Sequence, residues 1–132
     1  MSSYLTFYVQ HKGDDKKHPI MSYSRNNDIY RAFDENMNIA FCYNKIVYTE
    51  LTEGDITLVL NDLRKDIDSA EKRIQEYEKH ANGNPECIDE IIQLKEYVKD
   101  LEITYYKILT IEDIISDIQF GNDVEHVFCN IS

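Results

Sequence analysis

Two long series of apolar residues, separated by a four-residue turn, constrain the fold more than any other feature of this sequence. In each series the apolar positions recur at alternating intervals of four and three residues, which places them on one face of an α-helix. The first series is Ile56, Leu60, Leu63, Ile67, Ala70, Ile74, Tyr77 and Ala81, and the second is Cys87, Ile91, Leu94, Val98, Leu101, Tyr105 and Ile108. Two facing series of similar length predict an antiparallel coiled-coil helical hairpin over residues 52–109.

The residues at the ends of the two series are typical helix boundaries. Thr52 and Asp55 have the spacing of a capping box, in which two side chains satisfy free backbone N–H groups of a first helical turn. Gly83 suits the left-handed residue after a helix, Asn84 suits an N-cap and Pro85 suits a first helical position. A first helix of about 26 residues would be roughly 39 Å long.

The residues after the hairpin predict a change of structure. The apolar spacing fails at Glu112, and Ile111, Ile114, Ile115 and Ile118 begin an apolar face with a different orientation. We therefore expect a kink or a separate short helix that starts near Thr110, followed by a final strand or short helix over residues 124–131. Residues 110–132 are predicted to form a C-terminal cap.

The N-terminal part, residues 1–51, predicts a small β-rich unit. Leu5, Phe7 and Val9 occupy every second position and so lie on one face of an extended chain, which indicates a half-buried strand. The predicted elements are strands over residues 4–10 and 20–24, a short helix from about Asp28 to Asn36 and a third strand over residues 45–51. The fold class is therefore α+β: a small antiparallel sheet in β-β-α-β order, packed against the base of the hairpin, in a single domain spanning residues 1–132.

The distribution of charge limits the kinds of partner. The formal net charge is −11, and residues 55–132 hold 18 acids against 8 bases, whereas residues 1–54 hold 7 against 6. Such a field repels nucleic acid and anionic membranes and favours a protein partner with a basic surface. No apolar run approaches the roughly 20 residues of a membrane span, and the N-terminus lacks the features of a secretory signal. Three cysteines without metal or disulfide spacing favour a reducing, cytoplasmic environment.

The composition also suggests a source. Isoleucine, asparagine, lysine and tyrosine are abundant, while alanine, glycine, arginine and proline are scarce. This is typical of AT-rich coding sequences, and it leads to the hypothesis of a phage or mobile-element protein.

The sequence contains few arrangements that carry chemistry. The four glycines lie far apart, which excludes a glycine-rich phosphate loop. Asp34, Asn36 and Asn38 resemble half of a calcium loop, but Ile39 and Lys45 stand where glycine and glutamate are needed. His11 and His18 flank a turn without a clear third ligand. No cofactor and no metal are predicted.

Two groups of residues leave an enzymatic alternative open. Cys129 and His126 are three residues apart and include the types of a thiol nucleophile and its base. The acidic cluster of residues 112–125 has carboxylates of the kind that share a proton or hold a divalent cation in enzymes. A buried structural cysteine and a solvated acidic face are the simpler interpretations, so we predict that the protein is not an enzyme.

Tyrosine indicates where a partner would bind. Tyrosine is enriched at interaction surfaces because its ring is buried while its hydroxyl group keeps polar contacts. Tyr105 belongs to the second apolar series, so Tyr97 and Tyr106 are the candidates for exposed contacts. The predicted protein-binding residues are these two tyrosines, the hairpin tip (Asn82, Asn84 and Glu86) and the acidic residues Glu112, Asp113, Asp117, Asp123 and Glu125.

These observations favour a non-enzymatic, intracellular protein-binding module that acts through a rigid acidic helical hairpin. A homodimer through the hairpin is a variant of the same prediction. The main alternative is an acidic, nucleic-acid-mimicking inhibitor of a host nucleic-acid enzyme, of the anti-restriction or anti-CRISPR type. The third is a small enzyme using Cys129 and His126 or the acidic cluster.

Overall fold

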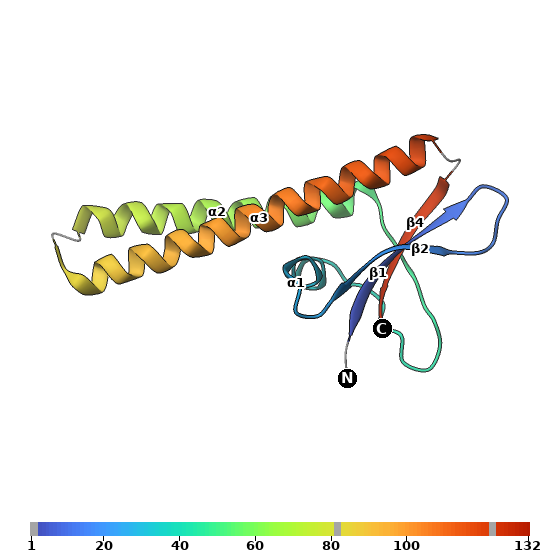
Figure 1. Ribbon diagram of the computed structural model, residues 1–132, viewed down its shortest axis with the longest axis horizontal. Helices are drawn as coiled ribbons and strands as arrows, with labels where there is room; N and C mark the ends of the chain where they lie inside the picture. Colours follow the sequence, from blue (N-terminus) through green and yellow to red (C-terminus); the bar gives the residue numbers. More distant parts are fainter. Residues whose placement is uncertain (1–2, 81–82, 122–123) are drawn as a thin grey trace.

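A computed structural model describes residues 3–80, 83–121 and 124–132 and contains a four-stranded sheet, one short helix and a long helical hairpin (Figure 1). The elements in chain order are β1 (Tyr4–His11), β2 (His18–Ser24), α1 (Asp28–Asn36), β3 (Thr49–Glu50), α2 (Glu53–His80), α3 (Pro85–Gly121) and β4 (Val124–Ile131). The far end of the hairpin extends well beyond the sheet (Figure 1). The α+β prediction is confirmed.

The sheet is antiparallel throughout and has the strand order β2-β1-β4-β3. Leu5, Phe7 and Val9 are buried on one face of β1, as their alternation predicts. The C-terminal segment is a strand, and the helical alternative for it is wrong. Nor is this strand a peripheral cap, because β4 pairs with β1 on one side and with β3 on the other.

The third predicted strand is much shorter than residues 45–51. Only Thr49 and Glu50 form β3, opposite Cys129 and Phe128 of β4. Further along β4 the edge is already occupied. The backbone N–H of Ile131 donates to the carbonyl of Ala40, and the carbonyl of Ile131 accepts from the N–H of Cys42. Residues 43–48 therefore have no strand edge to pair with there, and they form a loop.

The hairpin has the ends that the sequence predicts. The backbone N–H of Thr52 donates to Oδ2 of Asp55 at 2.9 Å, and that of Asp55 donates to Oγ1 of Thr52 at 3.3 Å. At the tip, Gly83 has a φ of 78° and the N–H of Glu86 donates to Oδ1 of Asn84 at 3.0 Å. These contacts confirm the capping box and the second N-cap.

The predicted apolar series face each other between α2 and α3. Away from the sheet they form a small buried cluster of Ile67, Ala70, Ile74 and Val98, with Ile91, Leu94 and Leu101 packed against it. Cys87 is only half-buried, so the series loses burial toward the tip. The helical hairpin itself is confirmed.

The separate short helix predicted near Thr110 is absent, since α3 is one continuous helix from Pro85 to Gly121. The hydroxyl group of Thr110 donates to the backbone carbonyl of Tyr106, one turn earlier, instead of capping a new helix. The apolar pattern changes because α3 changes partner. Its earlier residues pack on α2, whereas Ile111 and Ile115 join the core beneath the sheet.

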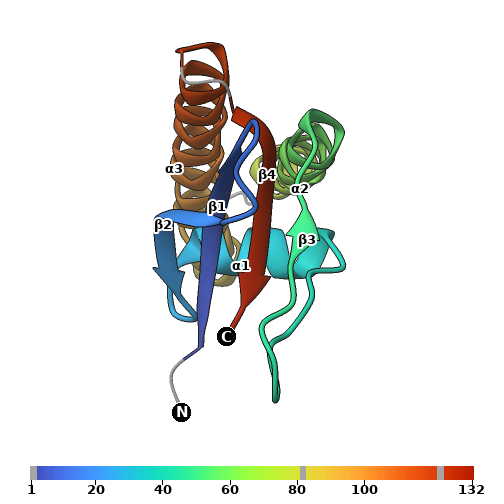
Figure 2. The ribbon, with the colours of Figure 1, turned by 90° about the vertical axis from the view of Figure 1, so that its right-hand side faces the viewer.

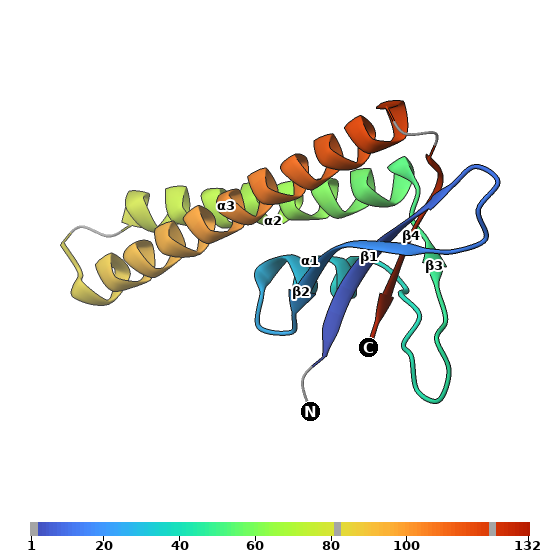
Figure 3. The same ribbon diagram turned by 45° about the vertical axis from the view of Figure 1, so that its right-hand side comes forward.

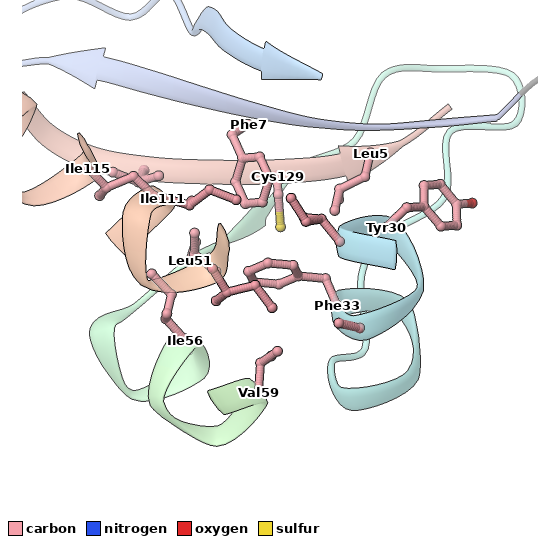
Figure 4. Close-up of a cluster of buried hydrophobic side chains, with 14 of the residues drawn as sticks. Leu5, Phe7, Tyr30, Phe33, Leu51, Ile56, Val59, Ile111, Ile115 and Cys129 are labelled. Carbon is pink, nitrogen blue, oxygen red and sulfur yellow. The ribbon is translucent and has the colours of Figure 1, made fainter. Parts of the chain in front are cut away.

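The main core lies between the sheet and three helices. Figure 2 shows α1 crossing behind the strands, on the side from which the hairpin extends. The close-up in Figure 4 shows β1, β4, α1 and the beginning of α2 each contributing side chains to one cluster. At its centre the rings of Phe7 and Phe33 meet edge to face, with their ring centroids 5.3 Å apart. This packing fixes α1 beside the base of the hairpin.

In the ranges that the structure describes, α2 and α3 are long enough to cross a bilayer but too polar, so no helix there is a candidate membrane span.

Candidate protein-binding site

A groove of about 360 Å³ separates α1 from the hairpin. Figure 3 shows α1 lying alongside the two long helices near the sheet. Its lining comes from three elements: Asp28, Arg31, Ala32, Glu35 and Asn36 of α1, Leu63 and Asp66 of α2, and Tyr97, Asp100, Leu101 and Thr104 of α3. The groove therefore depends on the docking of α1 and exists only in the folded protein. We refer to it as the α1 groove.

The α1 groove is acidic. It is lined by the carboxylates of four residues, Asp28, Glu35, Asp66 and Asp100, and by one base, Arg31. Nη2 of Arg31 lies 2.6 Å from Oδ1 of Asp28 on the same helix, so this base is already paired. Among the described residues, the other three carboxylates form no ion pair. A positive side chain entering the groove would therefore meet several carboxylates whose charge is not compensated.

Among the predicted contact residues that the structure describes, Tyr97 alone lines the α1 groove, and its side chain is half exposed. Two turns further along α3, Thr104 is buried and its hydroxyl group donates to the backbone carbonyl of Asp100. This hydrogen bond lies within α3 and does not use the carboxylate of Asp100. The groove thus combines an aromatic ring, an apolar floor at Leu63 and Leu101, and a charged rim.

The predicted acidic cluster of residues 112–125 does not form one site. Glu112 and Glu125 line a separate cleft of about 300 Å³ between the start of α2, the end of α3 and β4, together with Glu50, Glu53 and His126. Nδ1 of His126 lies 2.6 Å from Oε1 of Glu50. Asp113 and Asp117 are exposed and do not line that cleft. Asp123 lies outside the described residues.

The remaining predicted contacts are scattered. Asn84 and Glu86 are exposed at the tip of the hairpin, far from the α1 groove (Figure 1). Asn82 lies outside the described residues. Tyr106 is exposed on α3 and, unlike Tyr97, does not line the groove. Of the predicted residues that the structure describes, only Tyr97 therefore lies at this site.

Cys129 and His126 do not meet. Cys129 lies on the core-facing side of β4, where its sulfur atom points into the cluster around Phe33 (Figure 4). His126 contacts Glu50 at the sheet edge. Burial, and next the negative charge of Asp55, raise the pKa of the Cys129 thiol to about 12. A thiol that burial keeps protonated and enclosed is not an activated nucleophile.

The histidines of the first turn lie close together, with ring centroids of His11 and His18 5.8 Å apart. Nε2 of His18 contacts Oδ2 of Asp14 at 2.9 Å, and this hydrogen bond is the main cause of the lowered pKa of Asp14. In the part of the chain that the structure describes, no group of three or more histidine, cysteine or acidic side chains is arranged to hold a metal ion.

Comparison with protein-family models, with curated proteins and with solved structures finds no match to this chain. The α1 groove therefore has to be interpreted from its own residues. Most of these residues carry no sequence signal of a shared site, because Asp28 and Glu35 are separated from Asp66 and Asp100 by an intervening strand and loop. The one local signal is that Asp28 and Glu35 are seven residues apart, two turns along one helix.

Proposed function

We propose that this protein is a non-enzymatic protein-binding module that holds a basic segment of its partner in the α1 groove. The observation that supports this most directly is the set of four carboxylates around the groove, with a single arginine that is already paired. Charge of one sign on opposite walls attracts a segment of opposite sign and selects against acidic or nucleic-acid ligands.

The shape of the groove favours a lysine or arginine side chain with its aliphatic part. Leu63 and Leu101 offer apolar contacts to the methylene groups, while the carboxylates at the rim interact with the charged end. Tyr97 adds a half-exposed ring, on which a guanidinium or ammonium group gains a further attractive interaction. Tyrosine and arginine are among the residues that dominate binding energy at such interfaces.

Selection from a random library of peptides about twelve residues long tests this proposal, because the protein itself then chooses the sequences that it binds. The expected result is enrichment of lysine- and arginine-rich peptides that bind the unmodified chain. The double variant Asp66→Lys/Asp100→Lys should weaken their binding at least tenfold, or about 1.4 kcal/mol, because it sets like charges against the basic peptide.

A matched control uses Glu71→Lys/Glu76→Lys. Both residues are exposed on α2, outside the α1 groove, and the change in net charge is the same. Peptide affinity should change no more than about threefold in the control, the size expected for long-range, screened charges. Enriched peptides without an excess of basic residues, or equal losses in both double variants, would contradict the groove as the binding site.

The main alternative is the nucleic-acid mimic, which is favoured by the exposed carboxylates of Asp113 and Asp117 one turn apart on a rigid helix. Under this alternative the partner is a nucleic-acid enzyme, and DNA or RNA would compete with the protein for it. Asp113→Lys/Asp117→Lys should then abolish binding. If this double variant keeps full affinity for the partner while Asp66→Lys/Asp100→Lys loses it, the α1 groove is supported and the mimic is excluded.

A further inference from the structure

A second row of apolar side chains runs along α3 on the side that faces away from α2 and the sheet. Its members are exposed: Ile88, Ile92, Ile103, Tyr106 and Ile114. At about 100° per residue they fall within one arc of roughly 80°, opposite the buried residues of the same helix. A helix that is apolar on two opposite sides normally packs against something on both. We call this row the outer face of α3.

Four of the charged residues on and beside the outer face are placed symmetrically about Tyr106, whereas Glu96 and Glu102 have no charged counterpart. Lys99 and Lys95 precede it by seven and eleven residues, while Asp113 and Asp117 follow it by seven and eleven. All four side chains are exposed. Two apolar residues extend the same symmetry, because Ile92 and Phe120 lie fourteen residues on either side of Tyr106, and Phe120 is 97% exposed.

We infer that the outer face of α3 is an interface between two copies of this chain, packed antiparallel with Tyr106 at the two-fold axis. In this arrangement each residue meets the one that lies equally far on the other side of Tyr106 in the second copy. Lys99 then faces Asp113, Lys95 faces Asp117, and Ile92 faces Phe120. A parallel pair would instead place lysine against lysine and aspartate against aspartate, so the charges select the antiparallel dimer.

The intramolecular contacts of these residues do not oppose the dimer. The amino group of Lys95 lies 3.3 Å from Oε1 of Glu78, but both side chains are at least half exposed. Such a surface pair contributes little, so Lys95 can exchange it for an aspartate of the second copy. Lys99, Asp113 and Asp117 belong to none of the ion pairs found between described residues.

The outer face extends along most of α3. Residues 88–120 span about 48 Å along the helix, and specific interfaces bury roughly 800 Å² on each partner. At about 100° per residue, Tyr97 lies about 140° and Asp100 about 80° around the helix from the middle of the apolar row, on the side of the α1 groove. The dimer therefore leaves the α1 groove open, and this inference does not depend on the proposed function.

Sedimentation velocity over about 1–200 μM chain tests the dimer. The unmodified protein should sediment as a dimer in the upper part of that range. Lys95→Glu/Lys99→Glu and Asp113→Lys/Asp117→Lys should each weaken dimerisation at least tenfold, because each leaves like charges facing each other. The variant carrying all four substitutions has the original net charge and restores opposite charges only in an antiparallel pair, so it should dimerise again.

Lys65→Glu/Lys72→Glu is the matched control, since both lysines are exposed on α2 and the change in net charge equals that of Lys95→Glu/Lys99→Glu. This control should remain dimeric. Circular dichroism should show that each variant, with its exposed substitutions, keeps its helices. An unmodified chain that stays monomeric at about 200 μM overturns the inference. So does a dimer that survives both charge reversals, or a fourfold variant that stays monomeric.

Discussion

Cys129 shows how one residue type takes its properties from its place in the fold. It is fully buried, whereas Cys42 and Cys87 are half-buried. A thiol-specific reagent such as Ellman's reagent at pH 8 should therefore modify Cys42 and Cys87 in the folded protein and Cys129 only after unfolding. Mass spectrometry of digested, labelled protein gives the modified positions. Rapid labelling of Cys129 without denaturant would show that the core around Phe33 opens readily.

The same thiol makes stability depend on pH. Its pKa rises from the ordinary 9.0 to about 12 in the folded protein, chiefly because burial disfavours the thiolate. The thiol's contribution to the free energy of unfolding is therefore complete below pH 9. It is lost as pH rises from 9 toward 12, by up to about 1.4 kcal/mol per pH unit.

Urea unfolding at pH 8 and pH 10 measures this effect. The free energy of unfolding should fall more between these two pH values for the unmodified chain than for Cys129→Ala, which lacks the titrating group. Equal decreases in both proteins would mean that the folded and unfolded thiols titrate alike.

Individual residues also show what the sequence can and cannot reveal. The burial of Leu5, Phe7 and Val9 follows from their alternation, a local property that any paired strand would share. The burial of Asn130 does not. Its Nδ2 donates to the backbone carbonyl of Val47, 83 residues away in sequence, and this contact exists only because the loop before β3 crosses that position.

At the scale of elements, the start of α2 provides a direct test of local stabilisation. The carboxylate of Asp55 accepts hydrogen bonds from both the N–H and the hydroxyl group of Thr52, each at 2.9 Å. Asp55→Ala should lower the free energy of unfolding by about 1 kcal/mol, the usual value of an N-terminal cap. Asp68→Ala, on the exposed side of the same helix, should change it by less than about 0.5 kcal/mol. Equal losses of unfolding free energy for Asp55→Ala and Asp68→Ala in chemical denaturation would contradict a specific role for the cap.

Element boundaries could be predicted where a local contact defines them and not where tertiary packing does. Thr52 and Asn84 cap helices as predicted, and at the start of α1 the side chain of Asn27 likewise accepts from the N–H of Ile29. The separate helix expected near Thr110 is wrong because an apolar pattern reports which side is buried and does not distinguish a new helix from a new packing partner. Within the binding site, Tyr97 could be predicted as exposed, but its proximity to α1 required the docked structure.

At the scale of the whole molecule, the two apolar clusters predict unequal stability along the hairpin. The main core includes residues of the sheet, α1 and the base of both long helices. The second cluster, which we call the outer cluster, lies between α2 and α3 away from the sheet and consists of four buried residues and a few half-buried ones. Regions with few buried contacts open locally without global unfolding. The tip of the hairpin should therefore exchange its amide hydrogens faster than the sheet.

Two truncations separate these regions. Phe33→Ala removes a fully buried ring from the main core and should cost about 3–5 kcal/mol of global stability, because it leaves a cavity between β1 and α1. Ile74→Ala removes a side chain from the outer cluster, and it should mainly accelerate hydrogen exchange in the outer parts of α2 and α3 while β1 and β4 keep their protection. Hydrogen exchange followed by mass spectrometry resolves the two patterns. If Ile74→Ala accelerated exchange equally in the sheet, the hairpin and the sheet would unfold as one cooperative unit, and the α1 groove would be as stable as the core itself.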